Sequence, residues 1–239
     1  DTGADPIALR RALGRNSVTS LDAVLVSHLD ADHCGALAAL SGNVRPQRIY
    51  WAADLLTAQA DAPAINQGNT LVGATRNFEL QAGDVLTLSP QLRLVVLGPT
   101  APAQRGDNAD SLILSLDYDQ EGDGRPEFRV LLTGDAESPD LTALLDTLPD
   151  YHCTVLKVPH HGSRASVSAD LLASLDCQVA LVSVGADNNY GHPTDTALNL
   201  LAAANIPVFR TDQLGDIHLR FDTRGLVLSY TGHLDFWSF

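Results

Sequence analysis

The chain contains no methionine, a single lysine (Lys157) and only three cysteines among its 239 residues. No apolar run approaches the ~20 residues that a membrane-spanning helix needs. Because Cys34, Cys153 and Cys177 are odd in number and form no CxxC pair, we expect small buried apolar residues rather than metal ligands, and no disulfide partner. The chemistry of this globular chain must therefore rest on other side chains.

Positive charge is also scarce. The chain has 15 Lys and Arg residues against 29 Asp and Glu residues, which gives a formal net charge of −14 and a pI of about 4.7. Proteins that bind nucleic acid tightly without metals neutralise phosphates with basic patches. The composition argues against that class, but it is compatible with a nuclease whose bound cations meet the phosphate.

Apolar patterns and turn residues predict one α/β domain, residues 1–239, without repeats or linkers. Two sheets packed face to face with helices outside would account for so many short strands. We expect a loop at residues 61–76, an antiparallel sheet across residues 77–133 and no clear structure at 231–239. The expected helices are residues 4–16, 35–40, 52–60, 138–148, 167–175 and 194–204. The expected strands are 23–27, 48–51, 77–80, 84–88, 92–97, 111–118, 127–133, 154–158, 179–184, 207–210, 216–221 and 226–230.

The stretch Ser-His-Leu-Asp-Ala-Asp-His-Cys-Gly at residues 27–35 directly follows a buried strand. It places His28, Asp30, Asp32 and His33 within six residues. Imidazole nitrogens and carboxylate oxygens suit zinc, manganese or iron. The alternative is an acidic loop that happens to carry two histidines. We favour a metal site, because other predicted strands also end in ligand-type residues.

Two of those strand ends lie later in the chain. Asp135 follows Thr133-Gly134, and a carboxylate in this position can bridge two cations; the alternative is that it caps the next helix. His160 and His161 follow the strand at 154–158. Two adjacent histidines cannot point the same way, so one would bind metal while the other faces the substrate.

Further polar residues are candidates for contacting a substrate. His192 lies just before a predicted helix N-terminus, an end that attracts anions, although a structural role is equally compatible with its position. Asn108 and Ser111 precede a strand and either line the site or belong to a polar turn. The acidic stretch at residues 117–124 resembles a calcium loop but lacks the distal bidentate Glu, so we expect an acidic hairpin loop.

Together these motifs resemble the metallo-β-lactamase superfamily. The resemblance is carried by the run His28-x-Asp30-x-Asp32-His33, by Thr133-Gly134-Asp135 and by His160. More narrowly, it extends to the C-terminal hydrolase domain of ComEC-type competence (DNA-uptake) proteins and to the stand-alone hydrolases related to it. The motifs of that resemblance, in chain order, are SHLDADHCG, NADSLIL, LLTGD, LKVPHHGS, SVGADNNYGHP and TDQLGDI, and they cover roughly residues 1 to 230.

The resemblance implies an α/β (α+β) fold, a four-layer αββα sandwich with metals at one edge of the sheets. The chain begins with Asp1-Thr2-Gly3, which looks like the end of a strand and a turn. We therefore expect that the first strands of the sandwich are missing, either because this is a piece of a longer protein or because the natural chain lacks them.

Two positions depart from the β-lactamase pattern. Asp30 stands where the second histidine of HxHxDH is usual, and Asn108 lies near the place of the absent third-motif histidine. A carboxylate in place of an imidazole makes the site harder and more anionic, which favours manganese or magnesium over a strict zinc preference. It also argues against β-lactam hydrolysis.

The roles implied by the resemblance can be stated residue by residue. Two divalent ions, manganese or zinc with magnesium as a further option, would be held by His28, Asp30, Asp32, His33, Asp135 and His160. Asp30 or Asp32 would orient or deprotonate the attacking water, and His161 and His192 would contact phosphate or protonate the leaving oxygen. Asn108, Ser111, Ser163 and His192 would bind the substrate.

The function implied is hydrolysis of phosphodiester bonds in DNA, in the way that the non-imported strand is degraded during DNA uptake. The expected partners are single-stranded DNA and a membrane channel domain of the same protein, which would place the domain on the extracytoplasmic face of the membrane. Two alternatives stay open. One is a small-molecule esterase, resembling a phosphorylcholine esterase or a lactonase. The other is a non-catalytic module that guides DNA.

Overall fold

The computed structural model describes residues 1–222, 225–230 and 233–237. The chain divides into two compact units. Unit 1 comprises residues 1–84 and 96–113, and unit 2 comprises residues 85–95 and the described part of residues 114–239. Among the described residues, no helix is both long and apolar enough to span a membrane.

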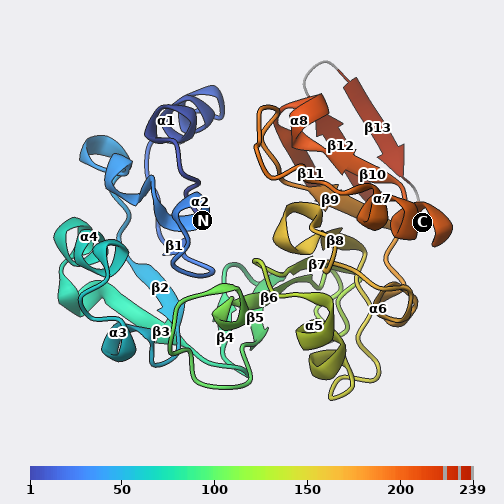
Figure 1. Cartoon of the computed structure of the whole chain (residues 1–239), viewed down its shortest axis with the longest axis horizontal. Coiled ribbons are helices and arrows are strands. Elements are labelled where there is room, and N and C mark those ends of the chain that lie inside the picture. Colours follow the sequence, from blue (N-terminus) through green and yellow to red (C-terminus); the bar gives the residue numbers. More distant parts are fainter. Residues whose placement is uncertain (223–224, 231–232, 238–239) are drawn as a thin grey trace. The chain divides into compact units, whose positions relative to one another are not determined.

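Unit 1 is built on a three-stranded parallel sheet in the order β1-β2-β3, which Figure 1 shows in blue to cyan. Its strands are β1 (Val24–Leu25), β2 (Ile49–Ala52) and β3 (Asn77–Leu80). Its α-helices are α1 (Pro6–Arg15), α2 (Ala31–Cys34), α3 (Leu55–Ala58) and α4 (Pro63–Val72). Its short 3-10 helices are η1 (Leu37–Ala39), η2 (Gly42–Val44), η3 (Ala74–Arg76) and η4 (Asn108–Asp110).

The core of unit 1 forms where α4 packs on the sheet. Trp51 is fully buried, and its indole Nε1–H donates a hydrogen bond of 2.9 Å to the side-chain oxygen of Asn77. A Cβ at Gly68 of α4 would come within 2.9 Å of both side chains. The helix can approach the sheet this closely only because this position carries no side chain.

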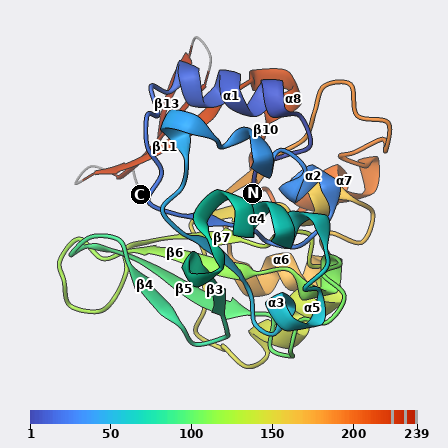
Figure 2. The ribbon, with the colours of Figure 1, turned by 90° about the vertical axis from the view of Figure 1, so that its left-hand side faces the viewer.

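Unit 2 contains most of a seven-stranded mixed sheet in the order β10-β9-β8-β7-β6-β5-β4. The four strands β7 to β10 are parallel, whereas β6 is antiparallel to β7 and β4 is antiparallel to β5. Figure 2 shows β4, β5 and β6 at one side of this sheet. The strands are β4 (Val85–Thr87), β5 (Leu92–Gly98), β6 (Ile113–Tyr118), β7 (Phe128–Leu132), β8 (Val155–Lys157), β9 (Val179–Val182) and β10 (Val208–Arg210).

A second sheet of unit 2 packs against the seven-stranded one. Its strands are antiparallel, in the order β11-β12-β13. Leu226 and Leu228 of β12 share a buried cluster with Val130, Val155 and Val179 of the larger sheet. The three strands are β11 (Ile217–Asp222), β12 (Gly225–Tyr230) and β13 (His233–Trp237), and the helices of unit 2 are α5 (Ser138–Leu145), η5 (Pro159–Gly162), α6 (Ala169–Leu175), α7 (Asp195–Ala203) and α8 (Thr211–Leu214).

The structure corrects three expectations about secondary structure. Residues 61–76 contain helix α4, which Pro63 begins and Gly73 ends, instead of a loop. Strand β3 pairs in parallel with β2 rather than joining an antiparallel series. Residues 233–237 form β13 where we expected no structure, and the rest of the 231–239 tail lies outside the described residues.

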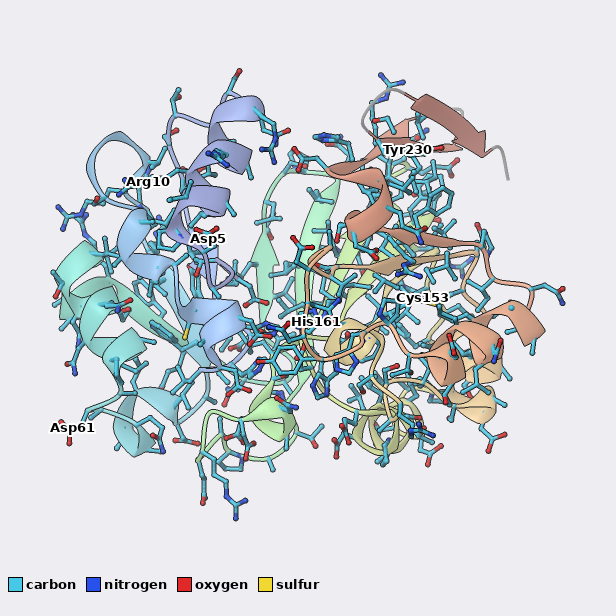
Figure 3. The ribbon with its side chains drawn as sticks, turned by 45° about the horizontal axis from the view of Figure 1, so that its top comes forward. Asp5, Arg10, Asp61, Cys153, His161 and Tyr230 are labelled. Carbon is cyan, nitrogen blue, oxygen red and sulfur yellow. A yellow bond between two sulfur atoms is a disulfide. The ribbon has the colours of Figure 1, made fainter. Side chains whose placement is uncertain are left out.

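The expectation that the cysteines have no disulfide partner was wrong. Cys153 and Cys177 are joined by a disulfide across 24 positions, and Figure 3 labels Cys153 in unit 2. Each follows a helix and precedes a strand, β8 and β9 respectively. These strands are parallel neighbours, so their N-terminal ends meet. Cys34 is free and buried, as we predicted.

Candidate metal centre

The loop that follows β1 holds the first group of predicted ligands. His28 is fully buried, and its imidazole Nδ1 lies 3.1 Å from the hydroxyl of Ser27 and 3.4 Å from that of Ser111. Its Nε2 lies 3.7 Å from a carboxylate oxygen of Asp30. Because both hydroxyls hold Nδ1, the Nε2 edge of His28 is directed at the predicted carboxylate ligand.

His33 is oriented by a residue that the sequence reasoning did not select. Its Nδ1 lies 2.9 Å from Asp1 Oδ2. A carboxylate accepts hydrogen bonds only, so Nδ1 is the donor and Nε2 is the nitrogen left to bind a metal ion. Asp1 also accepts bonds from the backbone N–H and the hydroxyl of Ser27, at 2.7 and 2.9 Å. A carboxylate that fixes the tautomer in this way is typical of metal-binding histidines.

The short helix α2 presents Asp32 and His33 together. It begins after Asp30, whose backbone oxygen accepts the N–H of His33 at 2.9 Å. One carboxylate oxygen of Asp32 and one ring nitrogen of His33 lie within 4.8 Å of each other. Asp30 and Asp32 are exposed while both histidines are buried. The loop therefore brings all four predicted ligands of unit 1 to one place.

Cys34 shows how much negative charge this loop carries. Its pKa is raised by burial, and the carboxylates of Asp30 and Asp32 raise it further. The thiol donates to the backbone oxygen of Leu29 at 3.1 Å. Cys34 is thus a protonated, structural residue beside a pair of carboxylates, and not a competing ligand.

A second segment of unit 1 is fixed to this loop. Asp110 accepts the backbone N–H groups of Gln104, Arg105 and Gly106, at 2.6 to 3.0 Å. Gly106 in turn accepts the N–H of Leu29 at 2.8 Å. This segment places the buried hydroxyl of Ser111 beside His28, so Ser111 supports a predicted ligand. Asn108 begins η4, three residues before Ser111.

Asp135 is the centre of the group in unit 2. It follows β7 through Gly134, whose positive φ of 52° turns the chain. The ammonium of Lys157, on the parallel neighbour β8, donates to Gly134 O at 2.7 Å and lies 3.5 Å from Asp135 Oδ1. Asp135 is 3% exposed. The only lysine of the chain therefore balances a buried carboxylate.

His160 and His161 both face Asp135. Their Nε2 atoms lie 3.9 and 3.5 Å from Asp135 Oδ2. The Nδ1–H of His161 donates to the backbone oxygen of Ser183 at 2.7 Å, which leaves Nε2 as the nitrogen that can bind a metal ion. Nδ1 of His160 lies 3.4 Å from Glu137. Figure 3 labels His161. Both histidines have positive φ, 44° and 52°, and such backbone strain is characteristic of functional sites.

His192 and Ser163 flank this pair. The imidazole of His192 lies edge-on to that of His160, with 5.7 Å between ring centres. Burial lowers the pKa of His192, and the charges of His160 and His161 lower it further. Gly162 O accepts both the N–H and the hydroxyl of Thr194, at 2.9 and 3.1 Å, which ties the two histidine segments together. Ser163 directly follows Gly162 in the chain and is buried.

The acidic stretch at residues 117–124 is the hairpin loop that we expected. Asp119 accepts the backbone N–H groups of Gly122, Asp123 and Gly124 at 2.7 to 3.2 Å, and its carboxylate also lies 3.9 Å from Arg93. These contacts give the carboxylate of Asp119 its hydrogen-bond and charge partners without a bound cation.

Comparison with known proteins shows which proteins this chain resembles. No family model matches the chain. It is 31% identical to ComE operon protein 3 of Bacillus subtilis strain 168 over 212 residues, which are 89% of this chain and 26% of that protein. It is 26% identical to competence protein ComA of Neisseria gonorrhoeae over 216 residues, 90% of this chain and 27% of that one. The structure resembles Zn(2+)-bound PqqB from Methylobacterium extorquens, with a TM-score of 0.54, 12% identity, and 87% and 80% of the two chains covered.

The chain has the metallo-β-lactamase fold and is a relative of the competence proteins. Both the predicted fold class and the predicted resemblance are thereby confirmed. The chain spans about a quarter of the length of the curated relatives named here. At 12% identity the likeness to PqqB concerns the fold alone.

Proposed function

We propose that this metallo-β-lactamase-fold domain is a metal-dependent hydrolase that cleaves phosphodiester bonds in single-stranded DNA. The observation that carries the proposal is the shared orientation of three histidines. Nδ1 of His28, His33 and His161 is held by a hydroxyl, a carboxylate or a carbonyl, which leaves Nε2 of each ring as the nitrogen that can bind a metal ion. Histidines that bind metals are oriented in this way.

The donor set fits divalent metal ions. Imidazoles and carboxylates would hold two ions, manganese or zinc, with magnesium as a further option. The proposed ligands are His28, Asp30, Asp32, His33, Asp135 and one histidine of the pair 160–161. Of that pair we favour His161 over His160, because His161 donates its Nδ1–H to a backbone carbonyl. Bound ions would supply charge stabilisation at the phosphoryl group and a water of lowered pKa.

The remaining residues have proposed roles around the reacting phosphate. Asp30 and Asp32 are exposed carboxylates that can orient the attacking water or accept its proton. His160 and His192 lie on the substrate side of Asp135 in this proposal, where each can donate a hydrogen bond to a phosphate or leaving oxygen. Lys157 holds the carboxylate of Asp135 in place and offsets its negative charge. Ser163 and Asn108 are proposed substrate contacts.

A small-molecule ester is the second candidate substrate. The observation that favours it is the net charge of −14, which repels a polyanion. The carboxylate-rich donor set favours a phosphodiester instead, because hard, anionic sites recruit the ions that serve phosphoryl transfer. A DNA-guiding module without catalysis would show metal-dependent binding and no turnover.

The test is cleavage of labelled single-stranded DNA by metal-stripped protein, with Mn²⁺, Mg²⁺ or Zn²⁺ added back. We expect metal-dependent cutting that falls at least about 100-fold in Asp32→Ala and His33→Ala, since each change removes a proposed ligand. Asp61→Ala, an exposed acidic residue of unit 1, is the matched control. Circular dichroism should show all variants folded.

The alternatives predict different outcomes. Turnover of a small ester with no cleavage of DNA would show that the domain is an esterase and not a nuclease. Binding of DNA without turnover of DNA or of any small ester, with any of the three metals, would indicate a non-catalytic module that guides DNA. Full DNA cleavage by Asp32→Ala would refute the ligand assignment. His160→Ala and His161→Ala, compared by metal stoichiometry, decide which histidine is the ligand.

We further propose that the domain works on the extracytoplasmic face of a membrane, attached to a channel domain of the same protein. Two findings support this placement. The chain matches a quarter of much longer competence proteins. It also carries a disulfide, and disulfides persist mainly in oxidising compartments.

A further inference from the structure

The segment between β9 and α7 carries the most exposed large apolar side chain of the described residues. Tyr190 is 78% exposed. A single exposed aromatic residue is ordinary on a protein surface. Tyr190 differs because the ring beside it belongs to a residue of the candidate site. The imidazole of His192 lies 6.1 Å away, centre to centre, with 18° between the planes.

This pair of rings is held on a rigid turn. Asn188 donates from its side-chain amide to the backbone oxygens of Gly185 and His192, at 3.0 and 2.8 Å, and accepts the N–H of His192 at 3.0 Å. Thr194 then ties the turn to the oxygen of Gly162. Two of these bonds join Asn188 and His192, on either side of Tyr190, so the turn is closed while the ring of Tyr190 is exposed to solvent.

The rings also lead to the candidate ligands of unit 2. His192 lies 5.7 Å from His160, ring centre to ring centre, and His160 Nε2 lies 3.9 Å from Asp135. A chain of aromatic rings thus runs from the buried carboxylate to the exposed tyrosine. A planar group placed on Tyr190 would lie at the outer end of this row of rings, two rings away from His160.

We propose that Tyr190, backed by His192, is a stacking platform for a nucleobase of a single-stranded substrate, next to the bond that is cut. The inference rests on the proposed function and deepens it, because it selects nucleic acid over small esters that lack a base. A chain with net charge −14 cannot rely on neutralising phosphates along a basic track. Stacking on an aromatic face is independent of charge and tolerates any base sequence.

The experiment compares two oligomers of equal length, oligo-dT and the same deoxyribose-phosphate backbone without bases. Binding by fluorescence anisotropy and metal-dependent cleavage are measured for the wild-type chain and for Tyr190→Ala, Tyr190→Phe and Tyr190→Trp. We expect Tyr190→Ala to raise Kd and KM for oligo-dT about tenfold to hundredfold. Both values should stay unchanged for the abasic oligomer. Phe and Trp should retain binding, because stacking needs the ring and not the hydroxyl.

Phe78→Ala is the matched control. Phe78 is an exposed aromatic residue of unit 1 packed beside Tyr50, so its loss should leave both oligomers unaffected. Equal losses for both oligomers in Tyr190→Ala would overturn the proposal, since they would mean that the change had disturbed His192. Unchanged oligo-dT binding, or failure of Tyr190→Phe to restore it, would also overturn it.

Failure of the proposed function gives a separate result. If the wild-type chain cleaves neither oligomer with any metal, the nuclease assignment fails, while the anisotropy measurement still decides whether Tyr190 stacks on bases. If Tyr190→Ala cleaves oligo-dT as well as the wild-type chain does, the nuclease stands and the platform is refuted.

Discussion

At the scale of single residues, the sequence predicted the ligand-type side chains but not what holds them. His28, Asp32 and Asp135 could be selected because each stands at the end of a predicted strand. Asp1 and Ser183 could not, because they act on histidines 32 and 22 positions away, and such contacts leave no local pattern. The choice between His160 and His161 likewise depends on a carbonyl that only the fold brings near.

A residue-scale prediction concerns Asp1. In Asp1→Asn the side chain can still accept from Nδ1 of His33, but it loses the charge that fixes the Nδ1–H tautomer. We expect metal affinity to fall about 10- to 100-fold with little change in the thermal unfolding midpoint. Titration calorimetry with Zn²⁺ or Mn²⁺ measures this.

The control for Asp1→Asn is Asp5→Asn. Asp5 caps α1 by accepting the N–H of Ile7 at 2.7 Å, and Asn caps helices about equally well. An Asp1→Asn chain that binds metal as tightly as the Asp5→Asn chain would show that Asp1 does not orient a ligand.

At the scale of elements, the strands and most helices followed from periodicity, while the errors arose from pairing and composition. Helix α4 contains Asn, Gln and Gly residues that weaken the helical signal, and its formation depends on burying Ile65 and Leu71. Strand β3 was placed correctly, but helices α3, α4 and η3 separate it from its parallel partner β2. Strand pairing of this kind is decided by packing, which a local reading cannot see.

One polar network inside the larger sheet gives an element-scale prediction. The hydroxyl of Tyr151 donates to Ser115 at 2.8 Å, Ser115 donates to Asp117, and Arg129 lies 5.4 Å above the tyrosine ring. Burial raises the pKa of Tyr151 well above its usual value near 10, despite the bond to Ser115. The network is therefore built around a neutral phenol.

The sign of the resulting pH dependence follows from this raised pKa. Above pH 10 the unfolded chain releases the proton of Tyr151 while the folded chain keeps it, so the free energy of unfolding falls as pH rises from 10. Tyr151→Phe should lower the free energy of unfolding by about 1 kcal/mol at pH 8, because a hydrogen bond is lost. Above pH 10 the free energy of unfolding of this variant should fall less steeply with pH than that of the wild-type chain. Urea unfolding at pH 8 to 11 tests this. Identical slopes for the two chains would contradict it.

At the scale of the whole molecule, composition predicted the class of protein but misjudged the cysteines. An odd count without a CxxC pair argued against a disulfide, yet Cys153 and Cys177 meet because β8 and β9 are parallel neighbours that start side by side. The resemblance of the ordered motifs, by contrast, predicted the metallo-β-lactamase fold correctly. A series of spaced motifs constrains a fold more strongly than a count of one residue type does.

The last prediction uses this disulfide to test where the chain works. The bond closes a loop with a separation of 24 residues, for which the chain-entropy model gives about 3.5 kcal/mol of stabilisation. Reduction, or the double change of Cys153 and Cys177 to Ala, should lower the free energy of unfolding by about that amount. Cys34→Ala is the control, because Cys34 is buried and forms no disulfide. In this variant the stability should still fall when reductant is added. Chain exported to an oxidising compartment should show one reactive thiol when denatured without reductant. Three reactive thiols would show that the disulfide does not form there, and the extracytoplasmic placement would lose the support that it draws from this bond.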